Sequence, residues 1–349
     1  MEPALRPMSL GEILDRTVQI YRKQFPVFLG IAAVPYVLAL FPISVFLLIE
    51  FGLGASGAGL VGSTGSLILI GLGIAVAVPV WIAATGLTTA ALNYAAWQCH
   101  LGEGTTIRSA YRDIWMRRWN YVGLFFLQCL LIGGVPAGAW LILAMAGAAV
   151  AVFLRGSLGP AAGALLVLLA ILAFIVISAY IIWMMLRLSL AFPASVVEQG
   201  GATDALSRSA ALSKGSRGRI FVMFLLVGLL NYLISIAVTL PLTLAAAVIP
   251  GMKNPAHLQA MLGVITVVSY GVSFAAQAFV MPIFAIAVLL FYFDQRIRKE
   301  GFDIEWMMLR AGLVVPPPPG EPSARSWEPV MPEESATPPP VPPQTQEPA

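Results

Sequence analysis

Six long stretches with almost no charge run through this chain, at about 25–49, 66–98, 119–154, 161–190, 220–250 and 261–293. A charged side chain at the centre of a bilayer costs about 2.5–3.5 kcal/mol even on insertion scales. A membrane-spanning helix needs about 20 consecutive apolar residues, and each stretch is at least that long. The pattern therefore predicts an all-α, polytopic membrane protein with six transmembrane helices.

Composition agrees with this class and argues against others. The chain is 59% hydrophobic and only 11% charged, whereas soluble domains average about 25% charged residues. A net charge of +3 is too small to suggest nucleic acid as a partner. Cys99 and Cys129 are expected to be free thiols, because no pattern of Cys, His and acidic residues has the spacing of a metal site. We predict no cofactor and no metal.

The basic residues predict the orientation. Eighteen of the twenty Lys and Arg residues lie in the segments 6–23, 108–118, 187–219 and 296–325, which alternate with pairs of spans. By the positive-inside rule these segments are cytoplasmic, and so are both termini. There the side chains would meet anionic headgroups. The predicted outer loops, near 52–65, 155–160 and 251–260, are too short for a catalytic domain.

Three amphipathic segments precede the pairs of spans. Ser9-Leu10-Gly11-Glu12 has the pattern of a capping box and opens a predicted helix. Similar helices are expected over 105–118, after a Thr cap, and over 202–214. Basic amphipathic helices of this kind lie in the headgroup plane. We therefore expect three interfacial helices, each followed by a transmembrane hairpin. The alternative is that these are ordinary basic loops, and homology between the three units stays open.

The stretch 119–154 is longer than one crossing requires. Gly133-Gly134-Val135-Pro136 is the natural place for a kink, and a break into two half-helices is the alternative. Gly134 and Gly138 have the spacing of a helix-packing pair.

The composition changes after Leu313. Residues 314–349 contain Pro316–Pro319, Pro338–Pro340 and Pro342-Pro343, with few apolar residues between them. Such a segment cannot bury enough surface to fold, and we predict a disordered cytoplasmic tail after a membrane domain over 1–313. The tail could bind a partner that recognises polyproline, but a plain disordered terminus is the preferred interpretation.

The spans carry polar residues but no ionisable group near their centres, which argues against a proton-coupled transporter. The candidate intramembrane polar residues are Asn93, Gln128, Asn231 and Gln277. Their ordinary role is hydrogen bonding between helices, and a ligand site is the alternative. Asn231 and Gln277 should face the interior of the bundle. His100 and His257 are predicted on opposite sides of the membrane, so they cannot form one site.

Three stretches together resemble a known family. They are Met8–Arg16 with Tyr21–Lys23, then Phe192–Glu198 with Ala205–Ser209 and Leu212–Gly215, and finally Tyr292–Asp303. They are similar to the bacterial membrane-domain family named after glycerophosphoryl diester phosphodiesterases. The resemblance implies a multi-pass protein of the bacterial inner membrane without an established role. It does not imply phosphodiesterase activity, because the catalytic barrel and its His-Arg-Gly signature are missing.

The last of these stretches is a candidate motif at the cytoplasmic rim. Asp294 and Glu198 lie near the inner interface, and either could pair with an arginine. The motif comprises Asp294, Arg296, Arg298, Lys299 and Glu300. We predict a non-enzymatic scaffold or accessory protein of membrane or envelope lipid homeostasis. The alternative is a transporter for a lipid or another hydrophobic molecule. An intramembrane enzyme is disfavoured, because no nucleophile–base pair is present.

Overall fold

A computed structural model describes residues 7–39, 64–153, 160–247 and 255–301, and in these ranges helices and short turns make up the chain, with no strand. By length and composition, five described helices can cross a membrane. Their elements are α3 (Thr64–His100), α5 with α6 (Arg118–Cys129 and Val135–Phe153), α7 (Pro160–Leu188), α10 (Arg217–Ala247) and α11 (Pro255–Glu300). The chain is thus a multi-pass membrane protein.

The first predicted span is described only in part. A helix covers Phe25–Ala39, which is short of a full crossing, and residues 40–49 lie outside the described ranges. The predicted Pro-rich tail at 314–349 also lies outside them.

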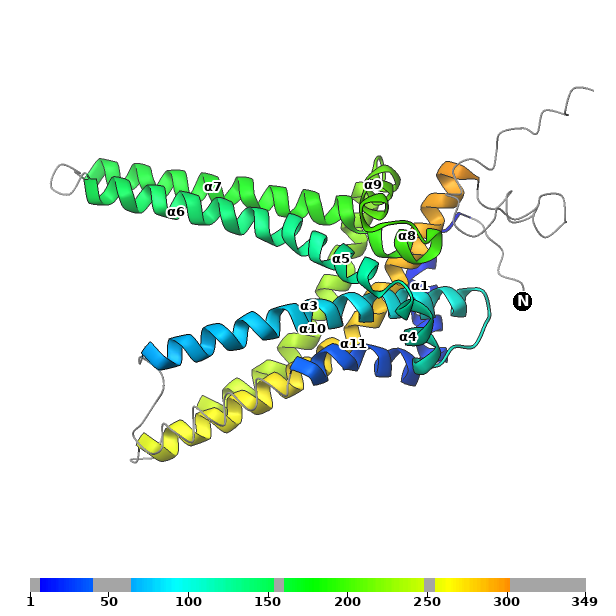
Figure 1. The fold of residues 1–349 in the computed structure, drawn as a ribbon, viewed down its shortest axis with the longest axis horizontal. Helices are drawn as coiled ribbons and strands as arrows, with labels where there is room; N and C mark the ends of the chain where they lie inside the picture. The colour runs from blue at the N-terminus through cyan, green and yellow to red at the C-terminus, as the bar shows by residue number, and fades with distance from the viewer. Residues whose placement is uncertain (1–6, 40–63, 154–159, 248–254, 302–349) are drawn as a thin grey trace, which may run out of the picture.

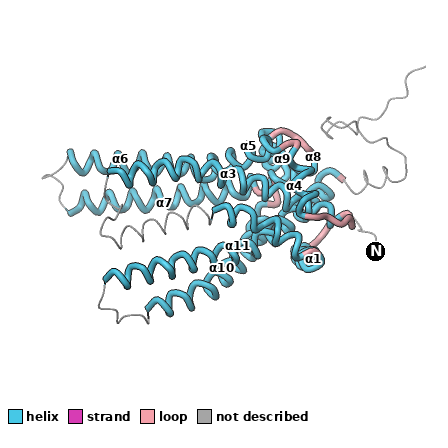
Figure 2. The backbone as a smooth tube through the Cα atoms, turned by 60° about the horizontal axis from the view of Figure 1, so that its bottom comes forward, coloured by secondary structure: helices cyan, strands magenta, loops and turns pink. Residues whose placement is uncertain are grey.

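The long helices converge at one end and separate toward the other (Figure 1). We call the converging end the basic end, because residues 108–118, 187–219 and 296–299 lie there. Short helices gather at this end: α1 (Leu10–Lys23), α4 (Ile107–Trp115), α8 (Ala191–Glu198) and α9 (Ala202–Ser213). Toward the far end, α6 pairs with α7 and α10 with α11, and the two pairs point apart in both views (Figures 1 and 2).

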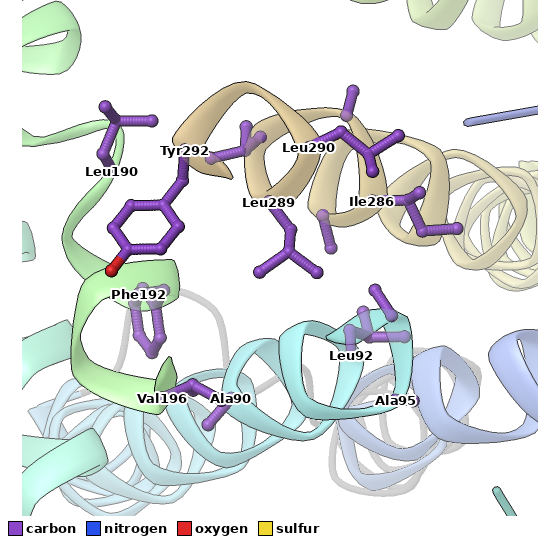
Figure 3. Close-up of a cluster of buried hydrophobic side chains, with 14 of the residues drawn as sticks. Ala90, Leu92, Ala95, Leu190, Phe192, Val196, Ile286, Leu289, Leu290 and Tyr292 are labelled. Carbon is purple, nitrogen blue, oxygen red and sulfur yellow. The ribbon is translucent and has the colours of Figure 1, made fainter. Parts of the chain in front are cut away.

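The buried core sits at the basic end. Side chains of α3, α8 and α11 meet there, among them Leu92, Phe192 and Leu289 (Figure 3). The far part of α7 is different. Val167 and Leu168 are 60% and 61% exposed, and no residue in the most apolar stretch of this helix is buried within the protein. Such a surface is stable only in an apolar solvent, so the bilayer is the natural environment of the far half.

The three predicted amphipathic helices are present. In α1 the Ser9 Oγ accepts the Glu12 N–H at 3.3 Å, and the Glu12 carboxylate accepts the Ser9 N–H at 2.7 Å. α4 begins with a similar box at Thr106. Part of each apolar face packs on the bundle: Ile13 and Ile20 of α1 and Ile114 of α4 are buried. Other apolar residues of these helices stay exposed, such as Val18 of α1 and Trp115 of α4. The placement of the three helices in the headgroup plane stays a prediction.

The chain passes the predicted kink without a break. Leu130–Gly134 form a π-helical turn, in which the Val135 N–H donates to the carbonyl of Leu130. The Leu131 carbonyl loses its usual α-helical donor, Val135, and Pro136 has no N–H to offer. The hydroxyl of Tyr180 on α7 donates to this carbonyl at 3.1 Å. A turn that leaves one acceptor free thus joins α5–α6 to α7.

Glycine allows two close helix contacts, neither at the predicted pair. A Cβ on Gly86 of α3 would lie 3.0 Å from the Phe125 Cβ and 3.1 Å from the Tyr121 carbonyl oxygen of α5. A Cβ on Gly30 would overlap the side chain of Ile107. A Cβ on Gly138 would meet nothing within 4 Å, so the structure gives Gly138 no packing role.

Candidate functional site at the basic end

The centre of the basic end is the carboxylate of Asp294, which is 0% exposed. Its oxygens accept hydrogen bonds from Arg219 at 3.0 Å and from Arg298 at 2.9 Å. The backbone N–H of Met8 donates to the same carboxylate at 2.8 Å, and Gln295 donates at 3.1 Å. A buried charge is tolerated only when it is paired and hydrogen-bonded, and this one is both.

The same two arginines also hold the N-terminal segment. Arg219 of α10 and Arg298 of α11 donate to the Met8 carbonyl at 3.1 and 3.0 Å. The backbone N–H of Met8 therefore binds Asp294, and its carbonyl oxygen binds the two arginines. We call Met8, Arg219, Asp294 and Arg298 the Asp294 cluster. It joins the segment before α1 to α10 and α11.

A second charged group, the Glu198 cluster, joins α8, α9 and α11. Arg208 donates to Glu198 at 2.8 Å and pairs with Glu300 at 2.6 Å. Tyr292 donates to Glu198 at 2.6 Å, and Arg296 pairs with Glu300 at 3.3 Å. Burial alone would lower the pKa of Arg208, but hydrogen bonds and charges from Glu300 and Glu198 outweigh it and raise the pKa. Arg208 is therefore permanently charged and serves to tie the three helices together.

Lys299 completes the rim. Its ammonium donates to the carbonyls of Ala211 and Leu212 at 3.2 and 2.8 Å. These groups lie in the last turn of α9, where helix carbonyls lack intrahelical partners and a cation complements the dipole.

The predicted rim motif thus has contacts for each of its five members. The expected pairing of Asp294 and Glu198 with arginines is present. The partners Arg208, Arg219 and Met8 were not predicted for these roles. α8 was also not predicted, because a short apolar segment shows no amphipathic pattern. In the structure its first six residues are all buried.

The intramembrane polar residues take different roles. Gln128 behaves as predicted, since its amide donates to the Leu188 carbonyl at the end of α7 at 2.9 Å. Asn93 does not, because it donates to Thr89 in its own helix at 2.8 Å. The Oδ1 atom of Asn93 is buried and has no partner among the described residues.

The register of α10 and α11 places Asn231 and Gln277 at the same level along the two helices. The rings of Phe224 and Phe284 make an edge contact with centroids 4.9 Å apart. About two helical turns further from the basic end, this antiparallel register reaches Asn231 on α10 and Gln277 on α11. Both are half-buried, and Asn231 Oδ1 is covered without a partner among described residues. The covered Oδ1 agrees with an orientation of Asn231 toward the bundle, whereas the orientation of Gln277 stays a prediction.

A cavity of about 330 Å³ lies between α1 and the α3–α4 loop. Arg16 and Lys23 line it, together with Glu103 and the thiol-bearing Cys99. The ends of α1 and α3 that border it are C-terminal ends, whose dipoles favour cations. The carboxylate of Glu103 and these two helix ends offset the positive charge of Arg16 and Lys23, so the cavity favours neither anions nor cations. His100 is buried nearby and stacks on Phe293, with centroids 5.3 Å apart.

Among the described residues, no group of three His, Cys, Asp or Glu side chains could hold a metal ion. Cys99 and Cys129 are free thiols. Comparisons with protein-family models, with curated proteins and with solved structures gave no match.

Proposed function

We propose that this chain is a non-enzymatic scaffold or accessory protein of the bacterial inner membrane, with a role in membrane or envelope lipid homeostasis. In this proposal it has six transmembrane helices and cytoplasmic termini, and α1, α4 and α9 lie at the inner membrane surface. It would belong to the membrane-domain family that its three motif stretches resemble.

The observation that supports a scaffold is the use made of the charged groups. Asp294, Arg219 and Arg298 bind one another and Met8. Glu198 and Arg208 are likewise engaged with each other. A catalytic acid or base needs access to a substrate proton, whereas these groups are committed to joining helices from distant parts of the sequence. Their arrangement builds a rigid platform at the membrane surface.

One experiment tests this role against enzymatic activity. The full chain in liposomes is incubated with glycerophosphocholine, with and without added Mg²⁺, Ca²⁺ or Zn²⁺. We expect no hydrolysis above that of protein-free liposomes. Metal-dependent hydrolysis that a single substitution abolishes would overturn the proposal.

The alternative function is transport of a lipid or other hydrophobic molecule. The amides of Asn231 and Gln277, at one level of α10 and α11, favour it, because Oδ1 of Asn231 has no partner among described residues. An amide in an apolar layer without a partner is costly, and a polar substrate group could supply the missing bond.

A lipid-scrambling assay separates the two functions. Liposomes with and without the protein contain a fluorescent lipid, and dithionite bleaches the outer leaflet. The scaffold predicts that the inner-leaflet signal survives in both samples. A transporter predicts that the protein removes this signal, and that Asn231→Leu restores it while the thermal transition is kept.

A further inference from the structure

We propose that Trp183, Arg187 and Arg217 form a binding site for the phosphate of one anionic phospholipid, where α7 ends and α10 begins. The proposal requires the chain to sit in a bilayer, as proposed above, but it is independent of the scaffold role.

Two cations share one aromatic ring at this site. The guanidinium carbon of Arg187 lies 5.1 Å from the ring centroid of Trp183, and that of Arg217 lies 5.7 Å from it. Both distances are within the range of cation–π attraction, about 6 Å. The indole therefore holds two positive groups at one place, although the two arginines belong to different helices.

Neither arginine is neutralised within the described part of the chain. The ion pairs found there involve other basic residues, namely Arg112, Arg208, Arg219, Arg296 and Arg298. The Nε atom of Arg217 is buried and has no acceptor among the described residues. A covered donor without an acceptor is unfavourable, and a guanidinium that the described residues leave without a hydrogen-bond acceptor or counter-ion is suited to an external anion. Arg187 alone could be explained by the dipole of α7, but that explanation does not apply to Arg217.

The surroundings suit a lipid better than a soluble anion. Trp183 is 41% exposed, and tryptophan is enriched at the level of lipid headgroups. Next to the arginines, α7 exposes Ile182 and α10 exposes Phe221 and Leu225. Acyl chains could cover these apolar side chains while the phosphate binds the guanidinium groups. A guanidinium can donate two parallel hydrogen bonds to one phosphate, a bidentate contact.

Native mass spectrometry of the full chain in detergent tests the proposal. The protein is titrated with dioleoyl phosphatidylglycerol or with dioleoyl phosphatidylcholine, and the dissociation constant of the first bound lipid is measured. We expect tighter binding of the anionic lipid. The double variant Arg187→Gln/Arg217→Gln should weaken that binding about tenfold or more, since it removes hydrogen bonds to a charged group. Trp183→Ala should weaken it about two- to fivefold.

Lys214→Gln is the matched control. It removes one positive charge three residues from Arg217, and Lys214 is exposed. This variant should bind phosphatidylglycerol as the native chain does. Equal losses in the control and the double variant would show a non-specific charge effect and overturn the site.

Two further measurements keep the test decisive. If the double variant does not fold, Arg187→Lys/Arg217→Lys keeps both charges. Its affinity for phosphatidylglycerol should still fall several-fold, because lysine cannot form the bidentate contact. Unchanged affinity in the lysine variant would then refute the proposal. Competition with glycerol 1-phosphate tests the lipid assignment, which is wrong if this soluble headgroup binds as tightly as the lipid. Failure of any of these tests leaves the hydrolysis and scrambling results, and so the proposed function, unaffected.

Discussion

Replacing Asp294 by asparagine tests whether the Asp294 cluster holds the basic end together. The change keeps the shape of the side chain and removes its charge. Arg219 and Arg298 would lose their common counter-ion, and the new amide group would present a donor where the cluster needs acceptors. Asp294 is 0% exposed, whereas the two arginines are 32% and 40% exposed.

These exposures set the size of the effect. Breaking a fully buried ion pair by removing one partner costs about 3–5 kcal/mol. Because water can replace part of the lost contact at both arginines, we expect a loss of about 2–4 kcal/mol in the free energy of unfolding. The loss should be concentrated at the N-terminal segment, because Met8 is bound to all three charged groups.

Hydrogen exchange of the full chain in nanodiscs measures this locally. Amides of α1 should exchange roughly 30- to 1000-fold faster in Asp294→Asn, since local opening then costs about 2–4 kcal/mol less. Asp15→Asn is the control, because it makes the same charge change on the exposed side of α1. If α1 exchanges equally in both variants, the cluster does not anchor the N-terminal segment and the reasoning is wrong.

Three further substitutions test the contact of α3 with α5, the hydrogen bond from α7 to the π-helical turn, and the Glu198 cluster. Thermal or denaturant unfolding measures each. Gly86→Val should cost about 1–3 kcal/mol, because its side chain would collide with α5; Gly73→Val, with nothing within 4 Å of its Cβ position, should be much milder, and equal effects would refute the close contact. Tyr180→Phe should cost about 0.5–1.5 kcal/mol by leaving the Leu131 carbonyl unpaired, and no change would mean that the π-helical turn needs no external donor. Glu198→Gln should cost about 1–3 kcal/mol and loosen α9, which unchanged exchange of α9 amides would contradict.

Local signals in the sequence predicted local structure well. The capping box at Ser9 and Glu12 is present because its partners are three residues apart. The irregular turn near Pro136 follows from the missing N–H of proline. Long spans were recognisable because a bilayer requires long uncharged runs.

Contacts between distant segments could not be predicted in the same way. Met8 and Asp294 are 286 positions apart, and nothing in either local sequence names the other as its partner. Asn93 was expected to join two helices, but the carbonyl of Thr89 one turn earlier satisfies its amide donor. The helix α8 was missed because a short buried helix has no polar face and no period to reveal it.

We propose that the basic end faces the cytoplasm, and single cysteines test this orientation directly. Single cysteines are placed at Ser56 or Ser157, in two predicted outer loops, and at Glu103 or Lys214, at the basic end, after Cys99 and Cys129 are replaced by serine. Intact cells are treated with a membrane-impermeant maleimide. We predict that Ser56→Cys and Ser157→Cys react in intact cells, and that Glu103→Cys and Lys214→Cys react only after the cells are opened. Reaction of the basic-end cysteines in intact cells would contradict the account.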